Sequence, residues 1–448
     1  MDATDGRLEA ATVRARVATR ENIARMNRSE RAASALWPVP LAFGLAAILV
    51  ARVTAVIDSR DALGIRGEFL IRDPDTALQL ASVVASGMLV FLGIVFSTTL
   101  VAIQLAGSQY SPRAVRIFLR LRLTKVALGV FVATFVFAVA VLGEIRTKSG
   151  SDFTPTASLT VLVLLMVATV VTFLVFASGT ARLLRIQYLV ERIADEARPV
   201  FRDAFTRAQE VQADRPAPAT ATRVCTNRSP GVLDAVDVAD LADAAAAAEG
   251  WIDVVAPVGG YVATGAPLAV VHGGGGGGGG DDRDGDQDVA IRRCFLLSNE
   301  RTMLEDPAFG LRQLVDVAIR GLSPAVNDPT TAVQVIDRIT DLLGGIADRP
   351  DPPEWYVDAA GTARVRMRGD TFDDLLRLGY VEIIRYGAGA PQVVRRLHAA
   401  FGSLSALGDA RHHASIAAMG ALLDAAVADA MPAPFSDLSG HPDPRGLG

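Results

Sequence analysis

Four long apolar runs near the amino terminus constrain this chain more than any other feature. They are Trp37–Ile57, Leu80–Ala106, Val126–Gly143 and Ala157–Ala177, and polar loops separate them. A hydrocarbon core about 30 Å thick is crossed by about 20 apolar residues at about 1.5 Å rise per residue. A soluble protein can bury one such helix, but four in succession predict a four-helix transmembrane domain over residues 37–181.

Arginine and lysine predict the orientation of the four helices. Seven arginines lie in residues 1–36, and the loop from Arg113 to Lys125 carries five basic residues and no acid. The segment after the fourth run opens with Arg182 and Arg185, whereas the other two loops are poor in basic residues. The positive-inside rule therefore predicts that both termini are cytoplasmic, with the first run as a signal anchor. High Ala, Gly and Arg with few Lys suggests a bacterial protein, and thus the inner membrane.

Charge and cysteine usage exclude several function classes. Residues 1–185 hold 20 basic and 12 acidic residues, whereas residues 186–448 hold 24 basic and 37 acidic ones. The basic excess suits anionic lipid beside the bilayer, and the acidic remainder argues against nucleic-acid binding. Two cysteines allow no disulfide framework or cysteine-rich zinc site. We predict no metal, no cofactor and no nucleic-acid partner.

The second apolar run carries small polar residues along one helical face. At about 100° per residue they share one sector, interrupted by Val90 and Leu100. One interpretation is helix packing, in which small residues allow close approach and hydroxyls bond across the contact. The other is a wet, pore-facing surface in an oligomer, with Gln104 as its most telling member. The candidate residues are Ser86, Ser97, Gln104 and Ser108.

The rest of the chain predicts a cytoplasmic α+β domain. A juxtamembrane helix and linker are expected over residues 182–228, the α+β domain over 229–430, and a disordered tail over 431–448. The segment Pro257–Val271 is similar to a strand pair of biotinyl-type domains, but it contains no lysine for attachment. The Gly- and Asp-rich stretch 273–288 lacks the endings of a phosphate loop and a calcium loop, so we expect a flexible loop.

Two well-marked helices meet at a polar corner. Asp306-Pro307 and Asp328-Pro329 are typical helix starts, with Asp as the N-cap and Pro at the first helical position. The corner between them is Ser323–Thr330. It is either a capping turn or an anion site that uses free N–H groups at a helix start, with charge from Arg301 or Arg320. The candidate residues here are Ser323, Asn327, Asp328 and Thr330.

Two stretches carry a resemblance to a known family. One is Gln104–Arg113 (QLAGSQYSPR) running into Leu128–Phe135 (LGVFVATF), and the other is Asp306–Ala332. Together they resemble the bacterial predicted-membrane-protein family of the domain of unknown function two-two-five-four, over roughly residues 35–430. The resemblance implies the four-span architecture and no established activity. It also implies that two corners matter. The first corner is Ser108–Arg113, with Tyr110, Pro112 and Arg113 as candidates, and the second corner is Ser323–Thr330.

These observations favour one function and leave a second open. The first is a channel- or transport-like homo-oligomer with a cytoplasmic regulatory domain, since four helices are few for a transporter. The alternative is a membrane-anchored sensor or scaffold whose cytoplasmic domain binds a small anion or a partner protein. No hydrolase or metalloprotease motif occurs, so no catalytic residue is predicted and we do not predict an enzyme.

Overall fold

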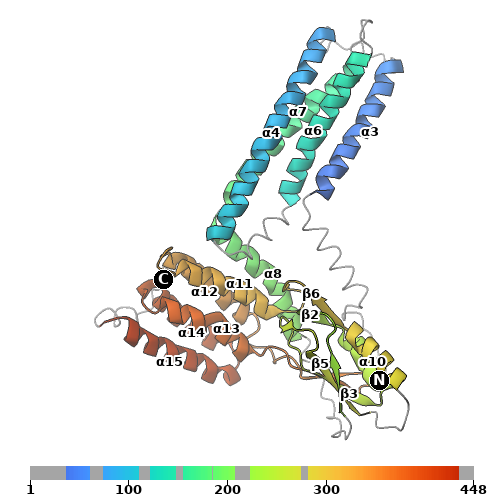
Figure 1. Ribbon diagram of the computed structural model, residues 1–448. Helices are drawn as coiled ribbons and strands as arrows, with labels where there is room; N and C mark the ends of the chain where they lie inside the picture. The colour runs from blue at the N-terminus through green and yellow to red at the C-terminus, as the bar shows by residue number, and fades with distance from the viewer. Residues whose placement is uncertain are drawn as a thin grey trace, which may run out of the picture. The chain divides into compact units, whose positions relative to one another are not determined.

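The computed structural model describes two compact units. It describes residues 37–60, 74–109, 122–147, 155–183, 185–206, 222–273 and 281–432 (Figure 1). The first unit, which we call the apolar unit, runs to Tyr188, and the C-terminal unit begins at Leu189.

The described part of the apolar unit consists of four helices: α3 (Pro38–Arg60), α4 (Pro74–Gln109), α6 (Arg122–Thr147) and α7 (Thr156–Leu183). Each contains a stretch long and apolar enough to cross a membrane: Pro38–Ser59, Asp75–Val101, Leu123–Ile145 and Thr156–Gly179. The prediction of four apolar helices is thus confirmed. Helix α4 begins before the predicted Leu80, because Pro74 suits a first turn and Ala77 and Ala81 are fully buried.

Helix α6 is the centre of the apolar unit and contacts α3, α4 and α7. Its Phe131 and Phe137 are fully buried. The Phe91 ring of α4 packs edge-on against Phe131 and Phe173, with centroids 5.1 and 4.9 Å apart. Edge-to-face pairs of this kind add to the free energy of apolar packing. The aromatic cluster therefore fixes how α4, α6 and α7 meet.

Polar contacts also tie the helices of the apolar unit together. The hydroxyls of Thr134 on α6 and Thr169 on α7 lie 2.9 Å apart. At the end of α3, the Asp58 carboxylate accepts hydrogen bonds from the backbone N–H groups of Ala157 and Ser158, at 2.8 and 3.0 Å. It caps the otherwise unpaired N–H groups at the start of α7. We call this contact the Asp58 clasp.

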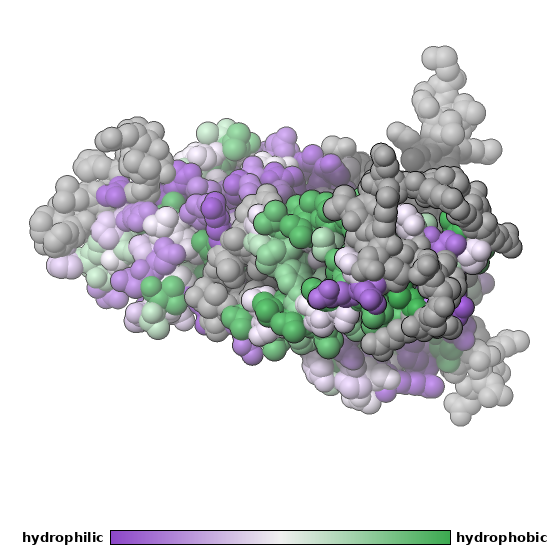
Figure 2. All heavy atoms as spheres, turned by 90° about the horizontal axis from the view of Figure 1, so that it is seen from above, coloured by the Kyte–Doolittle hydropathy of each residue, from purple (hydrophilic) through white to green (hydrophobic). Residues whose placement is uncertain are grey.

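The outer surface of the apolar unit is itself apolar. Only 22–28% of the candidate spans of α3, α4 and α7 is buried within the structure, against 44% for the span of α6. Figure 2, seen from above, shows a large patch of hydrophobic residues over this unit. A water-soluble protein rarely exposes so continuous an apolar surface. The exposed residues include Leu45, Leu49, Val83, Leu89, Val90, Ile94, Phe96, Leu164, Val167, Val171 and Leu174.

Two sheets make up one half of the C-terminal unit. The five-stranded sheet has the order β1-β5-β3-β8-β7, and the three-stranded sheet the order β4-β2-β6. Helices α9 (Val238–Ala247) and α10 (Asp281–Arg293) accompany them. Inward-facing residues such as Leu233, Leu241 and Ile252 are fully buried. The strands are β1 (Thr222–Thr226), β2 (Gly231–Val236), β3 (Gly250–Val254), β4 (Tyr261–Val262), β5 (Pro267–Gly273), β6 (Phe295–Ser298), β7 (Trp355–Val357) and β8 (Ala363–Met367).

The structure differs from the sequence predictions at three places in this half. Strand β1 lies in the expected linker 182–228, where it pairs with β5. Helix α10 occupies the second part of the expected loop 273–288, since Asp288 pairs with Arg292 one turn on and Ile291 is buried. Strands β4 and β5 do not pair with each other, because β4 pairs with β2 and β5 with β1 and β3. The expected biotinyl-type strand pair is therefore wrong.

Helices form the other half of the C-terminal unit. The predicted N-caps are confirmed, since Asp306 accepts from the N–H of Phe309 and Asp328 from that of Thr331. Thr371 and Asp374 form a reciprocal capping box at the start of α13. The helices are α8 (Ile186–Thr206), α11 (Pro307–Gly321), α12 (Pro329–Gly344), α13 (Phe372–Gly387), α14 (Pro391–Leu407) and α15 (His413–Ala430), with a short 3₁₀ turn, η3 (Ala410–His412), before α15.

Helix α8 is amphipathic and buries its apolar face within the C-terminal unit. Leu189, Ile193, Ala197, Phe201 and Phe205 recur at helical spacing and are at most 2% exposed. A side-chain carbon added to Gly310 of α11 would lie 2.6 Å from the side chain of Ala197, so small residues bring these helices into close contact. The apolar face of α8 is therefore part of the core of the C-terminal unit.

A charged cluster lies between the sheets and the helices. Arg301 donates to Asp306 at 2.6 and 3.0 Å, and Gly259, at φ +77°, passes so close that no side chain would fit. The carboxyl of Asp370 lies nearby. Burial, and then the neighbouring carboxylates of Asp306 and Asp374, raise the pKa of Asp370 to about 6. Asp370 thus keeps its proton to a higher pH in the folded state than in the unfolded chain.

This raised pKa predicts a pH-dependent stability. The ordinary value for Asp370 is 3.8, so its contribution to stability is full below that value and is lost as pH rises through about 6. Ionised Asp370 costs at most about 3 kcal/mol at neutral pH. We expect Asp370→Asn to raise the thermal unfolding midpoint at about pH 7.5 and to change it little near pH 4.

Tryptophan fluorescence of the full chain in detergent measures this effect, since Trp251 and Trp355 lie in β3 and β7. Asp348→Asn, at an exposed position, is the matched control for the lost charge. Equal midpoints for Asp370→Asn and wild type at every pH would contradict the prediction.

Candidate functional site

The C-terminal unit contains a groove of about 500 Å³ where α8, α12 and α14 meet. This volume lies within the range of small-molecule sites. The turn after α12 completes the groove with Ile346 and Arg349. The lining residues are Arg198, Phe201, Arg202, Asp337, Thr340, Asp341, Leu342, Gly344, Gly345, Ile346, Arg349, Arg396, Ala399, Ala400, Ser403 and Leu407. We call this site the arginine groove.

The rim of the arginine groove is positively charged, with four arginines and two aspartates. Arg198 pairs with Asp341 at 2.7 Å, and Arg396 with Asp337. Arg349 instead donates to a neutral group, the hydroxyl of Thr206, at 2.7 Å. The excess of positive charge stands out because residues 186–448 are acidic as a whole. Anions are therefore the ligands that this rim favours.

The floor of the arginine groove is apolar. Phe201, Leu342, Ile346 and Ala400 are each at most 4% exposed, so they form a packed base. Leu407 of α14 stands at the edge with 61% of its surface exposed. A ligand in the groove would thus meet charge at its sides and hydrocarbon beneath.

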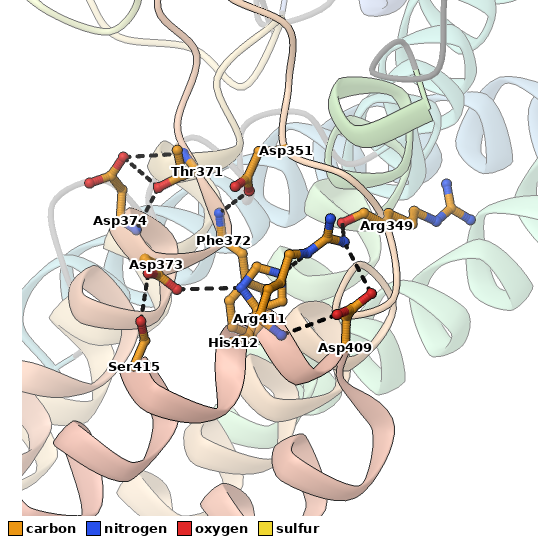
Figure 3. A network of polar contacts seen from close by, with 10 residues as sticks. All are labelled: Arg349, Asp351, Thr371, Phe372, Asp373, Asp374, Asp409, Arg411, His412 and Ser415. Carbon is orange, nitrogen blue, oxygen red and sulfur yellow. Dashed lines mark hydrogen bonds and ion pairs between the residues drawn. The ribbon is translucent and has the colours of Figure 1, made fainter.

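A polar network joins Arg349 to a buried histidine (Figure 3). The guanidinium of Arg411 donates to the backbone oxygen of Arg349 at 2.6 Å and to Nε2 of His412 at 3.0 Å. Nε2 is then an acceptor, so the ring proton lies on Nδ1, 3.5 Å from the carboxylate of Asp373. Ser415 donates to the same carboxylate at 2.5 Å. The carboxylate stands between the serine and the histidine, which is not the order of a nucleophilic triad.

The predicted residues of α4 lie on its exposed face. Ser86, Ser97 and Gln104 are exposed in the single chain, and Ser86 donates to the backbone oxygen of Ser82 at 2.7 Å. Ser108 belongs to α4, but its side chain lies outside the described part of the chain. The candidate span of α4 ends at Val101, so Gln104 lies beyond it. Packing against α3, α6 or α7 does not account for this stripe, and pore lining stays a prediction.

The structure describes the predicted candidate residues of the second corner but not those of the first. Tyr110, Pro112 and Arg113 lie outside the described residues. In the second corner, the Ser323 hydroxyl donates to the backbone oxygen of Arg320 at 2.6 Å, and Asn327 adopts φ +50°. Thr330 lies 3.5 Å from the amide nitrogen of Gln392.

Helix capping accounts for several of the contacts in the second corner. The Asp328 carboxylate accepts from the N–H and the hydroxyl of Thr331, at 3.2 and 2.6 Å. Arg301, proposed as a source of charge, is paired with Asp306. The capping interpretation explains these contacts, and an anion site at this corner stays a prediction.

Sequence reasoning missed the arginine groove. Arg198 and Arg202 lie on α8, Arg396 on α14 and Arg349 in the turn after α12, and no short motif links them. The available signal was the recurrence of arginine on the polar face of α8, at Arg192, Arg198 and Arg202. On a helix whose other face is apolar, that pattern is typical of a solvated surface, so it did not indicate a site.

Comparison with known proteins finds one family and several relatives. Residues 33–403 match the model of the family described as "Predicted membrane protein (DUF2254)". The chain is 31% identical over 335 residues to the uncharacterized proteins Rv1290c of Mycobacterium tuberculosis (strain ATCC 25618 / H37Rv) and Mb1321c of Mycobacterium bovis. Each alignment covers 72% of this chain and 63% of the relative, so the chain spans less than two thirds of these relatives' length.

No solved structure matches the chain. The family match covers most of the sequence, includes all four apolar helices and reaches into α14. It confirms the resemblance seen in the two corner motifs. The chain therefore belongs to the family of predicted membrane proteins described as DUF2254.

Proposed function

We propose that this membrane protein is an anchored sensor whose C-terminal unit binds a small anion in the arginine groove. The observation that carries the proposal is the excess of arginine around a groove of ligand size. Arginine guanidinium groups bind carboxylate and phosphate oxygens through paired hydrogen bonds. Of the two functions considered from the sequence, the anion-binding sensor accounts for this rim.

Helix α8 connects the arginine groove to the apolar unit along the chain. It is the next helix along the chain after α7, and it supplies Arg198 and Arg202. Polar contacts to α8 include Arg198 with Asp341 at 2.7 Å and Arg349 with Thr206 at 2.7 Å. Arg198 and Asp341 are about half exposed, and exposed ion pairs contribute about 0–1 kcal/mol. An anion can therefore compete for these arginines at little cost in free energy.

The proposal predicts anion binding that depends on Arg202. With inorganic pyrophosphate as the probe, we expect saturable binding to the full chain in detergent, measured by calorimetry. Arg202→Gln removes a charge-assisted contact worth about 1.5–3 kcal/mol, so the Kd should rise roughly tenfold to a hundredfold. Arg192→Gln is the matched control, since it removes the same charge from α8 outside the groove.

Two results would refute the proposal. One is the absence of saturable binding to a folded wild-type chain. The other is an equal loss in the Arg202→Gln and Arg192→Gln variants, which would indicate attraction to the overall charge of α8 rather than a site.

The channel-like oligomer is a second candidate, supported by the exposed stripe of α4. Ser82, Ser86, Gly93 and Ser97 are all exposed in the single chain. Small polar residues facing lipid gain nothing, whereas facing a second copy or a wet pore they find partners. We expect ion flux in liposomes that hold the protein, reduced by Ser97→Leu and unchanged by Val163→Leu on α7. Flux no greater than that of empty liposomes would exclude a channel.

We also propose that both termini are cytoplasmic in a bacterial inner membrane, because the arginine-rich segments alternate with arginine-poor loops. An impermeant maleimide added to intact cells should label Arg66→Cys and leave Phe118→Cys unlabelled. The native thiols are buried, and burial raises the pKa of Cys225 to about 11, so background labelling should be low. The opposite labelling pattern would reverse the topology.

A further inference from the structure

The arginine groove offers more than an inorganic anion needs. Its volume of about 500 Å³ greatly exceeds the space of one or two phosphate groups. The buried side chains of Phe201, Leu342 and Ile346 form an apolar floor that a fully hydrated ion would not contact. The excess space and the floor together point to a ligand with an organic body.

The charges that line the arginine groove indicate that the ligand also carries a negatively charged group. Two of the four arginines lie beside groove aspartates, Arg198 with Asp341 and Arg396 with Asp337. Arg349 contacts a hydroxyl, and Arg202 lies 3.7 Å from Asp203, outside the groove, with both side chains about two thirds exposed. Arg202 and Arg349 thus supply two positive charges that the groove itself does not balance. A group with two negative charges complements them, as a phosphate ester or diphosphate does and a single carboxylate does not.

We infer that the ligand of the arginine groove is an organic phosphate, with its phosphate at Arg202 and Arg349 and its organic body over the apolar floor. This inference rests on the proposed anion site and adds the ligand class. A nucleotide and a single-chain phospholipid share this chemistry. Burying part of the organic body should make either bind more tightly than pyrophosphate, since apolar burial contributes about 25 cal/mol per Å².

Calorimetry on the full chain in detergent can compare four probes: adenosine diphosphate, a short-chain lysophosphatidate, inorganic pyrophosphate and adenosine. We expect one organic phosphate to bind at least about tenfold more tightly than pyrophosphate, a difference of about 1.4 kcal/mol. Adenosine, which lacks the phosphate, should bind at least about tenfold more weakly than the diphosphate. Preference between the diphosphate and the lysophosphatidate identifies the source of the phosphate.

Two variants separate the parts of the site. Ala399→Leu fills the groove above the floor and should remove the tenfold advantage of the organic phosphate while pyrophosphate still binds. Arg202→Gln should weaken both ligands. Ala417→Leu, at an exposed position of α15, is the matched control for the added volume and should bind as wild type does.

The possible failures are distinguishable. If pyrophosphate binds as tightly as every organic phosphate, the ligand class is wrong and the anion site stands. If the advantage survives in Ala399→Leu, the organic body does not lie over the floor and the inference is overturned. If no probe binds to a folded wild-type chain, both the inference and the proposed function fail.

Discussion

Burial of the apolar face of α8 is the interaction on which the candidate site depends. Leu189, Ile193, Phe201 and Phe205 remove this face from water, which stabilises each side chain by about 1.5–3 kcal/mol. The exposed ion pairs around it contribute far less. Apolar packing therefore sets the position of α8, and the polar residues on its rim are left to contact a ligand. Without α8, the groove would lose one wall and two of its four arginines.

The two units bury apolar residues to different extents. The C-terminal unit buries apolar residues inside and turns charge outward. The apolar unit instead leaves most of its hydrophobic surface exposed and buries chiefly α6, whose Phe131 and Phe137 are fully enclosed. Lipid gives no hydrophobic drive for helices to associate, so close packing and hydrogen bonds such as that between Thr134 and Thr169 hold this unit together.

Local signals in the sequence predicted the local structure well. The apolar helices and the caps at Asp306 and Asp328 depend on residues near each other in the chain. Failures came where distant contacts decide the outcome. Strand β1 forms because β5 lies beside it, and α10 because its buried face meets the sheets. The arginine groove is the extreme case, since its lining spans residues 198–407 and only the fold assembles it.

The Asp58 clasp has a consequence for biogenesis. It joins the end of the first helix to the start of the fourth, across 99 residues of chain. During synthesis α3 is made before α7. The Asp58 carboxylate therefore has no partner at the start of α7 until those residues have been synthesised. The clasp closes only when all four helices are inserted and aligned. The clasp is therefore a feature of the complete four-helix bundle, and a partly inserted chain cannot form it.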